Sequence, residues 1–235
     1  MNPMEDSELD VETFARFVDQ TLLSPTVGVS EATKWIEENA ARGFATLCVA
    51  PVFVASAARL LEGSKTTVCS VCGFPLGYSL TTTKSEETRH LVSLGCTEVD
   101  MVLNVGELLA GNVDYVEHDI AAVVQAAKDE SPDRSRVKVI LETGHLSEEQ
   151  VAAACRIAEA AGADFVKTST GFGPRGASVR DVEIMHATVG GRLGIKAAGG
   201  IRDLDSALAL IRAGATRLGT SSGGRLLDEL AARRA

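Results

Sequence analysis

Short apolar, β-forming runs alternate with amphipathic helical segments along the whole sequence, and glycine or a polar loop separates them. The pattern occurs eight times. Strict alternation of this kind implies a parallel sheet covered by helices. The predicted strands are residues 17–22, 44–50, 67–73, 98–104, 137–143, 165–169, 193–197 and 217–221. The predicted helices are residues 30–42, 51–62, 82–94, 114–129, 148–161, 179–189, 203–213 and 225–233.

Eight strand–helix units in 235 residues favour closure of the sheet into a single (β/α)8 TIM barrel, because such barrels typically take about 250 residues. The alternative is a doubly wound open sheet. No Gly-x-Gly-x-x-Gly dinucleotide motif follows the early strands, which counts against that alternative. We therefore expect residues 1–235 to form one barrel domain, with residues 1–12 as a mobile acidic N-terminal segment.

Capping residues mark several of the predicted helix starts. Ser30 is predicted to cap the helix over 30–42, and Pro51 to stand in the first turn of the next helix. Ser147 and Gln150 have the spacing of a capping box at the start of the helix over 148–161.

The acidic composition limits the possible partners. A net charge of −9 argues against nucleic acid or an anionic membrane as a ligand. No apolar run reaches the roughly 18 residues that a membrane-spanning helix needs. The acidic start also lacks the basic and apolar regions of a signal peptide. We therefore expect a cytoplasmic protein without nucleic-acid or membrane partners.

The sequence contains five cysteines, an odd and scattered set that favours reduced thiols. Cys69 and Cys72 have the spacing of a C-x-x-C motif. Both lie in one predicted strand, however, where positions three residues apart face opposite sides. We therefore expect this pair to form neither a metal site nor a redox site.

Three charged residues interrupt predicted strands that are otherwise apolar: Asp100, Lys167 and Lys196. Lys and Asp are rarely fully buried without partners, so this placement needs a reason. A purely structural ion pair would account for only one of the two lysines. An ordinary lysine, with a pKa of about 10.4, is almost entirely protonated at neutral pH. Burial and a neighbouring cation lower such a pKa and release a nucleophilic amine. The three residues together predict one lysine that forms a Schiff base with an aldehyde, a second that tunes it, and an acid that relays protons.

Two glycine-rich loops follow the seventh and eighth predicted strands. The first contains Gly199 and Gly200, and the second covers residues 219–224 and leads into a helix. Barrels often bind phosphate in these two loops, with backbone N–H groups and a helix N-terminus. Ordinary turn glycines are the alternative reading, but glycines in both expected places favour a phosphate site. Residues 168–173, after the sixth strand, are expected to form a third wall or a flap.

A series of motifs covering nearly the whole chain resembles the deoxyribose-phosphate aldolase family. They are D-Q-T-L-L at 19–23, C-V-A-P at 48–51, G-F-P-L-G at 73–77, E-V-D-M-V at 98–102, V-I-L-E-T at 139–143, and the blocks 165–171, 194–202 and 218–223. The resemblance implies reversible cleavage of 2-deoxy-D-ribose 5-phosphate to acetaldehyde and D-glyceraldehyde 3-phosphate, in deoxyribonucleoside catabolism. It implies no metal or other cofactor.

The resemblance also implies roles for individual positions. Lys167 would form the Schiff base, Lys196 would be the tuning cation, and Asp100 would be the proton-relay acid. The residues implied to surround the substrate and its phosphate are Asp19, Thr21, Cys48, Thr170, Gly171, Gly199, Gly200, Gly219, Ser221 and Ser222.

The segment after residue 171 departs from the family pattern. Phe172 stands where some members have a lysine, and Arg175 is a candidate replacement cation for the phosphate. Glu142, at the end of a predicted strand, is a candidate partner for one of the lysines.

Two other functions remain open at this point. A different Schiff-base aldolase would keep Lys167 and change the acceptor aldehyde. A non-catalytic phosphosugar-binding protein would need the phosphate loops but neither interior lysine. The expected partners are small phosphosugar and aldehyde substrates, with a homodimer as the default assembly because closed twofold dimers are the commonest oligomers.

Overall fold

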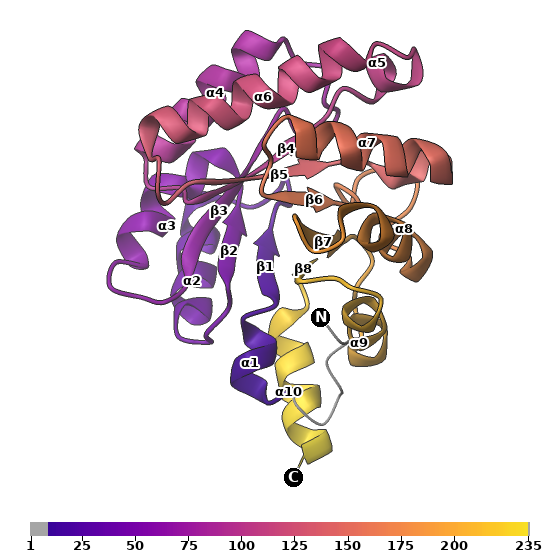
Figure 1. Ribbon diagram of the computed structural model, residues 1–235. Coiled ribbons are helices and arrows are strands. Elements are labelled where there is room, and N and C mark those ends of the chain that lie inside the picture. The colour runs from indigo at the N-terminus through magenta and orange to yellow at the C-terminus, as the bar shows by residue number, and fades with distance from the viewer. Residues whose placement is uncertain (1–8, 235) are drawn as a thin grey trace.

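The strands form a closed parallel barrel in the order β1 to β8, which confirms the predicted (β/α)8 fold. The structure is a computed structural model and describes residues 9–234. Figure 1 shows the strands at the centre of the molecule and the helices outside them. The strands are β1 Val18–Leu22, β2 Thr46–Val49, β3 Thr67–Cys72, β4 Glu98–Val102, β5 Arg136–Ile140, β6 Phe165–Lys167, β7 Gly194–Ala198 and β8 Arg217–Thr220.

Each predicted helix is present, with ends that differ by a few residues. The α-helices are α1 Val11–Ala15, α2 Val29–Ala40, α3 Val54–Leu60, α4 Thr81–Ser93, α5 Val105–Leu109, α6 Val113–Glu130, α7 Glu148–Ala160, α8 Val179–Val189, α9 Leu204–Arg212 and α10 Gly223–Arg234. Within residues 9–234 there are also two 3-10 turns, η2 Pro51–Phe53 and η3 Thr143–His145. The sequence analysis did not predict α1, α5 or η3, each of which spans five residues or fewer.

The helix caps agree with prediction at one helix and differ at another. The Ser147 hydroxyl accepts a hydrogen bond from the Gln150 backbone at 3.3 Å, and the Gln150 side chain accepts one from the Ser147 backbone at 2.8 Å. This confirms the predicted capping box of α7. The prediction for Ser30 is wrong, because α2 begins one residue earlier, at Val29, and its N-cap is Gly28.

The barrel closes where β1 pairs with β8, with Val18 opposite Leu218 and Asp19 opposite Gly219. Helix α1 lies beside α10 at the lower end of the molecule in Figure 1. Residues 1–8 of the predicted mobile segment lie outside the described residues. Its remaining residues belong to the fold, because Leu9 is buried and the Asp10 side chain accepts a hydrogen bond from the Thr13 backbone at 2.7 Å.

The main apolar core lies between the outer surface of the barrel and the helices. Alternate residues of a strand point to opposite sides, so Val99 and Met101 of β4 join this core. Their neighbours Glu98 and Asp100 point into the barrel, where both take part in ion pairs. The interior of the barrel is therefore partly charged.

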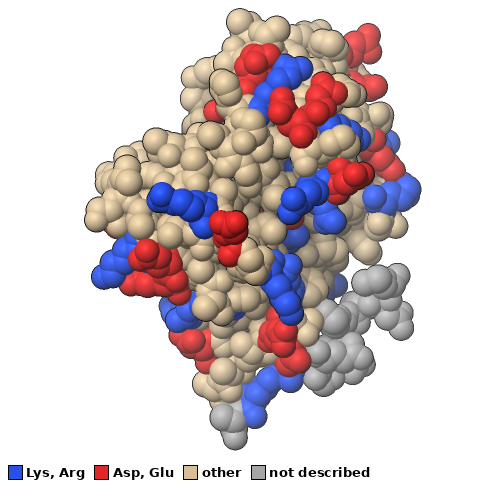
Figure 2. All heavy atoms as spheres, turned by 90° about the vertical axis from the view of Figure 1, so that its left-hand side faces the viewer, with Lys and Arg blue, Asp and Glu red and all other residues tan. Residues whose placement is uncertain are grey.

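The surface shows no large area of a single charge on the face in Figure 2, where basic and acidic side chains are interspersed. Among the helices of residues 9–234, none combines the length and apolar character needed to cross a membrane.

Candidate active site

The three predicted charged residues meet inside the barrel. Asp100 accepts hydrogen bonds on one oxygen, Oδ2, from Lys167 Nζ at 2.8 Å and from Lys196 Nζ at 2.7 Å. Its other oxygen, Oδ1, accepts from Lys138 Nζ at 2.8 Å. Asp100, Lys138 and Lys196 are completely buried, and Lys167 is 3% exposed. A single carboxylate therefore joins three lysines from three consecutive strands.

A second tier of charges lies next to this group, and most of it was not predicted. Lys138 Nζ is 2.6 Å from Glu98 Oε2. Arg217 Nη1 is 2.9 Å from the same oxygen and 2.5 Å from Asp19 Oδ1. Asp19 Oδ2 is in turn 2.6 Å from Lys196 Nζ. The sequence analysis identified Asp19 but missed Lys138, Glu98 and Arg217.

These contacts fix the charge state of two members of the site. Burial raises the pKa of Asp100, but Lys138, Lys167 and Lys196 outweigh that effect and hold the pKa well below its ordinary value. Burial lowers the pKa of Lys196, but Asp100 and Asp19 outweigh it and raise the pKa above the ordinary value. Asp100 is therefore a carboxylate and Lys196 an ammonium group across the physiological range.

Lys167 differs from the other two lysines in its partners. Its Nζ contacts one carboxylate, whereas Lys196 contacts both Asp19 and Asp100. Lys138 lies close to three carboxylates. The described cluster holds four cationic side chains and three carboxylates, so loss of one proton balances its charge. Of the three lysines, Lys167 has the fewest carboxylate contacts.

Of these three lysines, only Lys167 lines a cavity at the C-terminal end of the barrel. The cavity measures about 320 Å³, within the range of about 300–1,000 Å³ usual for small-molecule sites. Of the other residues predicted to surround the substrate, those that line it are Thr21, Thr170, Gly171, Gly199, Gly200, Gly219 and Ser221. This is the end of a (β/α)8 barrel where active sites occur.

Three of the predicted binding residues do not line the cavity. Asp19 and Cys48 are buried beneath it, with exposed fractions of 0% and 1%. Ser222 lines a neighbouring hollow on the outer surface, together with Arg42 and Arg225.

Glycine conformation shapes part of the cavity wall. Gly199 and Gly200 have φ angles of +89° and +79°, which side chains other than glycine rarely adopt. Gly219 has a different role, since a Cβ atom there would lie 2.9 Å from Lys196 Cε. The absence of a side chain at Gly219 therefore leaves room for Lys196.

Arg202 lines the same cavity, directly after the loop that contains Gly199 and Gly200. Its side chain is exposed and forms no ion pair with another residue in the described range. The sequence analysis quoted this residue only as part of a motif and proposed Arg175 as the cation instead. That proposal is wrong: Arg175 forms a bidentate ion pair with Asp181 and does not line the cavity.

The flap after β6 is held by Glu142. This residue is the one non-glycine within residues 9–234 that has a positive φ, at 53°. Its buried carboxylate accepts hydrogen bonds from the Thr170 hydroxyl and, at 3.3 Å, from the Thr170 backbone N–H. The prediction that Glu142 is a partner for a lysine is therefore wrong. Phe172, two residues after Thr170, lines the cavity and packs edge-on against Phe74 with ring centroids 5.5 Å apart.

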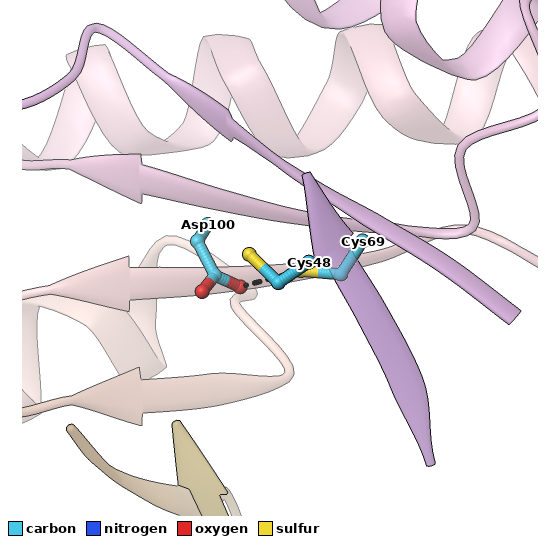
Figure 3. A group of neighbouring side chains, drawn as sticks. All are labelled: Cys48, Cys69 and Asp100. Atoms are coloured by element: carbon cyan, nitrogen blue, oxygen red, sulfur yellow. Dashed lines mark hydrogen bonds between the residues drawn. The ribbon is translucent and has the colours of Figure 1, made fainter. Parts of the chain in front are cut away.

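Three side chains beneath the cavity have the spacing of metal ligands. Ligand atoms of Cys48, Cys69 and Asp100 lie within 4.8 Å of one another (Figure 3). However, Asp100 already accepts from three ammonium groups, and Lys138 Nζ is 3.4 Å from Cys69 Sγ. A divalent cation here would face these positive charges at short range, so the donor set does not suit a metal ion.

A buried lysine that opens into a small cavity, beside a carboxylate and a second cation, defines the class of barrel enzymes that act on carbonyl compounds. The sequence matches the family model of the DeoC/LacD family aldolases over residues 13–226. The chain therefore belongs to the DeoC/LacD family of aldolases, which are lyases acting on small molecules.

Individual relatives support this assignment. The chain is 50% identical to the deoxyribose-phosphate aldolase of Geobacillus sp. (strain WCH70), covering 91% of this chain and 94% of that one. It is 46% identical to the deoxyribose-phosphate aldolase of Caldanaerobacter subterraneus subsp. tengcongensis, covering 96% and 97%. The solved structure of the tetrameric deoxyribose phosphate aldolase from Aeropyrum pernix superposes with a TM-score of 0.87 at 31% identity, covering 95% and 93%.

Proposed function

We propose that this enzyme reversibly cleaves 2-deoxy-D-ribose 5-phosphate to acetaldehyde and D-glyceraldehyde 3-phosphate through a Schiff base on Lys167, in deoxyribonucleoside catabolism. The observation that carries the proposal is the position of Lys167, which lines the cavity and shares Asp100 with Lys196. The relatives named above bear the name of the same activity.

The chemistry begins at the carbonyl carbon of the open-chain sugar. The neutral amine of Lys167 attacks C1, and loss of water from the carbinolamine gives an iminium ion. The iminium withdraws electrons from the adjacent carbon, so that removal of the proton from the C3 hydroxyl breaks the C2–C3 bond. Glyceraldehyde 3-phosphate leaves, and the remaining enamine is protonated at C2 and hydrolysed to acetaldehyde and free Lys167.

Asp100 and Lys196 handle the protons in this scheme. Asp100 is a carboxylate held in place between ammonium groups, so it can pass protons to and from the reacting groups without moving. Lys196 remains positively charged because Asp100 and Asp19 flank it. Lys196 shares the Asp100 oxygen with Lys167, which suits it to the proposed role of the cation that tunes the nucleophile.

The phosphate group would bind at the opposite end of the cavity. The backbone around Gly199 and Gly200, the segment from Gly219 to Ser221, and the flap residue Gly171 provide N–H groups and close approach. Arg202 would supply the positive charge. A phosphate here would lie across the cavity from the aldehyde end of the sugar at Lys167.

We further propose that the chain is a single-domain cytoplasmic enzyme that works as a homodimer without a metal or other cofactor. All five cysteines are free thiols, which suits a reducing compartment.

Reductive trapping tests the central proposal. The protein is incubated with acetaldehyde and sodium borohydride, and its mass and peptide map are measured. We expect one ethyl adduct on Lys167 and none in Lys167→Leu. The exposed Lys34→Leu variant is the control and should trap as the wild type does. An adduct spread over surface lysines, with none on Lys167, would refute the Schiff-base role and favour a phosphosugar-binding protein.

A panel of acceptor aldehydes tests the substrate. The synthesis direction should be fastest with glyceraldehyde 3-phosphate and acetaldehyde. A trapped Lys167 combined with a strong preference for another acceptor would assign the chain to a different aldolase reaction.

A further inference from the structure

Two cysteine thiols lie side by side beneath the cavity, and the proposed chemistry does not use them as a pair. Cys48 of β2 and Cys69 of β3 are directly opposite each other in the strand register. Both side chains point into the barrel and are 1% and 0% exposed. With Val71 they form a small cluster separate from the main apolar core. Figure 3 shows the two sulfur atoms and the Asp100 carboxylate close together, and the dashed line joins Asp100 to Cys69.

The surroundings of this pair lower the pKa of Cys48. The adjacent Cys69 and the ammonium groups of Lys196 and Lys167 lower it, whereas burial and Asp100 raise it, and the net shift is downward. Burial instead raises the pKa of Cys69, whose thiol donates to Asp100 Oδ1 at 3.3 Å. Burial also raises the pKa of Cys96 and of Cys155 to about 12. Cys48 is therefore the cysteine best suited to act as a nucleophile, and Cys69 is its neighbour.

The strand geometry allows the two sulfur atoms to bond. Adjacent strands lie about 4.8 Å apart, and disulfides join residues whose Cα atoms are about 4.4–6.8 Å apart. A register pair on adjacent strands such as Cys48 and Cys69 therefore falls within this range. Cys72, three residues after Cys69, cannot take part because its thiol contacts Lys84 and Thr88 of α4 outside the barrel.

We propose that Cys48 and Cys69 are a peroxide-sensitive dithiol, and that their disulfide reversibly lowers aldolase activity. The Cys48 thiol gives its proton to solvent, the thiolate attacks one oxygen of a hydroperoxide, and the O–O bond breaks. Cys48 becomes a sulfenic acid, and the hydroxide or alkoxide that leaves takes a proton from solvent to become water or an alcohol. The Cys69 sulfur then attacks the Cys48 sulfur. The S–O bond breaks, and the hydroxide that leaves takes the thiol proton of Cys69 as water. With hydrogen peroxide, two thiols and one peroxide give one disulfide and two waters.

The route to the thiols and the consequence for catalysis both follow from neighbouring contacts. Thr21, the register partner of Cys48 on β1, lines the cavity, so Cys48 lies beside the cavity wall, where a molecule as small as hydrogen peroxide would approach it. Disulfide formation removes the hydrogen bond from Cys69 to Asp100. This consequence rests on the proposed role of Asp100, whereas formation of the disulfide does not.

Peptide mapping and activity measured on the same samples test the proposal. The enzyme is treated with graded hydrogen peroxide, quenched, alkylated in denaturant and mapped by mass spectrometry. We expect a Cys48–Cys69 cross-link, with activity falling in proportion to the cross-linked fraction and returning on addition of dithiothreitol. Substrate bound in the cavity should slow the cross-linking.

Two variants separate this mechanism from others. In Cys69→Ala, Cys48 should be oxidised to species that dithiothreitol does not reverse, so the activity lost to peroxide is not recovered. Cys72→Ser, on the same strand but facing α4, should respond to peroxide as the wild type does. A cross-link between other cysteines, or none at all, would overturn the dithiol. A full cross-link with unchanged activity would overturn its effect on catalysis while leaving the aldolase assignment intact.

Discussion

Replacing Lys138 with methionine tests how the charged interior is stabilised. The change keeps the length of the side chain and removes the cation that contacts Glu98 at 2.6 Å and Asp100 at 2.8 Å. Removing one partner of a buried ion pair costs about 3–5 kcal/mol. Asp100 keeps two lysines and Glu98 keeps Arg217, so we expect the lower end, about 3 kcal/mol. For a chain of this size that corresponds to a fall in Tm of about 6–12 °C.

The measurement is thermal unfolding followed by circular dichroism at neutral pH, with Lys128→Met as the control. Lys128 is exposed on α6, so its replacement should change stability by less than about 0.5 kcal/mol. If Lys138→Met lowered Tm by no more than the control, the reasoning about the charged interior would be wrong.

The pH dependence of the Tm difference gives a second test of the same reasoning. The pKa of Asp100 is held below its ordinary value, with Lys138 as the strongest favourable cause after the opposing effect of burial. A carboxylate of this kind stabilises the fold above its unfolded pKa of about 3.9, and that stabilisation is lost as the pH falls through the folded pKa. Without Lys138 the folded pKa rises towards the unfolded value, so the variant has less of this stabilisation to lose in acid. We expect the Tm difference between Lys138→Met and wild type to narrow as the pH falls from about 5 towards about 3.

Three further substitutions test the cavity. Arg202→Ala should raise KM for the phosphorylated substrate about tenfold, the equivalent of about 1.4 kcal/mol, with kcat nearly unchanged. Arg175→Ala should leave KM unchanged and lower only Tm. The reverse pattern in steady-state kinetics would contradict our proposal that Arg202 is the phosphate cation. Gly219→Ala introduces a methyl group 2.9 Å from Lys196 Cε and should lower kcat about tenfold or more, an overpacking cost of about 1–3 kcal/mol; a variant with wild-type kcat would show that this space is not needed. Glu142→Gln should weaken the charge-assisted hydrogen bonds to the flap by about 1.5–3 kcal/mol and raise KM more than it lowers kcat. A shift in Tm with unchanged KM would indicate a purely structural role for Glu142.

The meeting of Asp100, Lys167 and Lys196 could be predicted from sequence because of their local surroundings. Asp100, Lys167 and Lys196 each stand between apolar neighbours in a predicted strand, and burial of a charge there demands an explanation. Lys138 escaped detection because the segment R-V-K-V-I at 136–140 also fits a strand with one face in water. Arg136 is in fact exposed and Lys138, on the same side of β5, is buried. Only closure of the barrel shows that this side of β5 faces the interior and not water.

The ion pair of Arg175 was missed for a similar reason. Arg175 and Arg202 both follow glycine-rich segments, and nothing local shows which of them faces the cavity. The choice depends on Asp181, which lies six residues after Arg175 and binds its guanidinium group. Such a contact depends on how the flap folds back onto the start of α8, a geometry that spacing along the chain does not reveal.

The pairing of Asp19 with Arg217 also has a consequence for biosynthesis. The two residues are 198 positions apart, and their side chains are 2.5 Å apart in the finished barrel. A ribosome makes the carboxylate of β1 early and its guanidinium partner of β8 only near the end. Until then the nascent chain cannot bury Asp19 in its native ion pairs, and a partly made barrel carries an uncompensated charge at its open seam. The interior charges thus favour chains that are complete and penalise those that stop before the last strand.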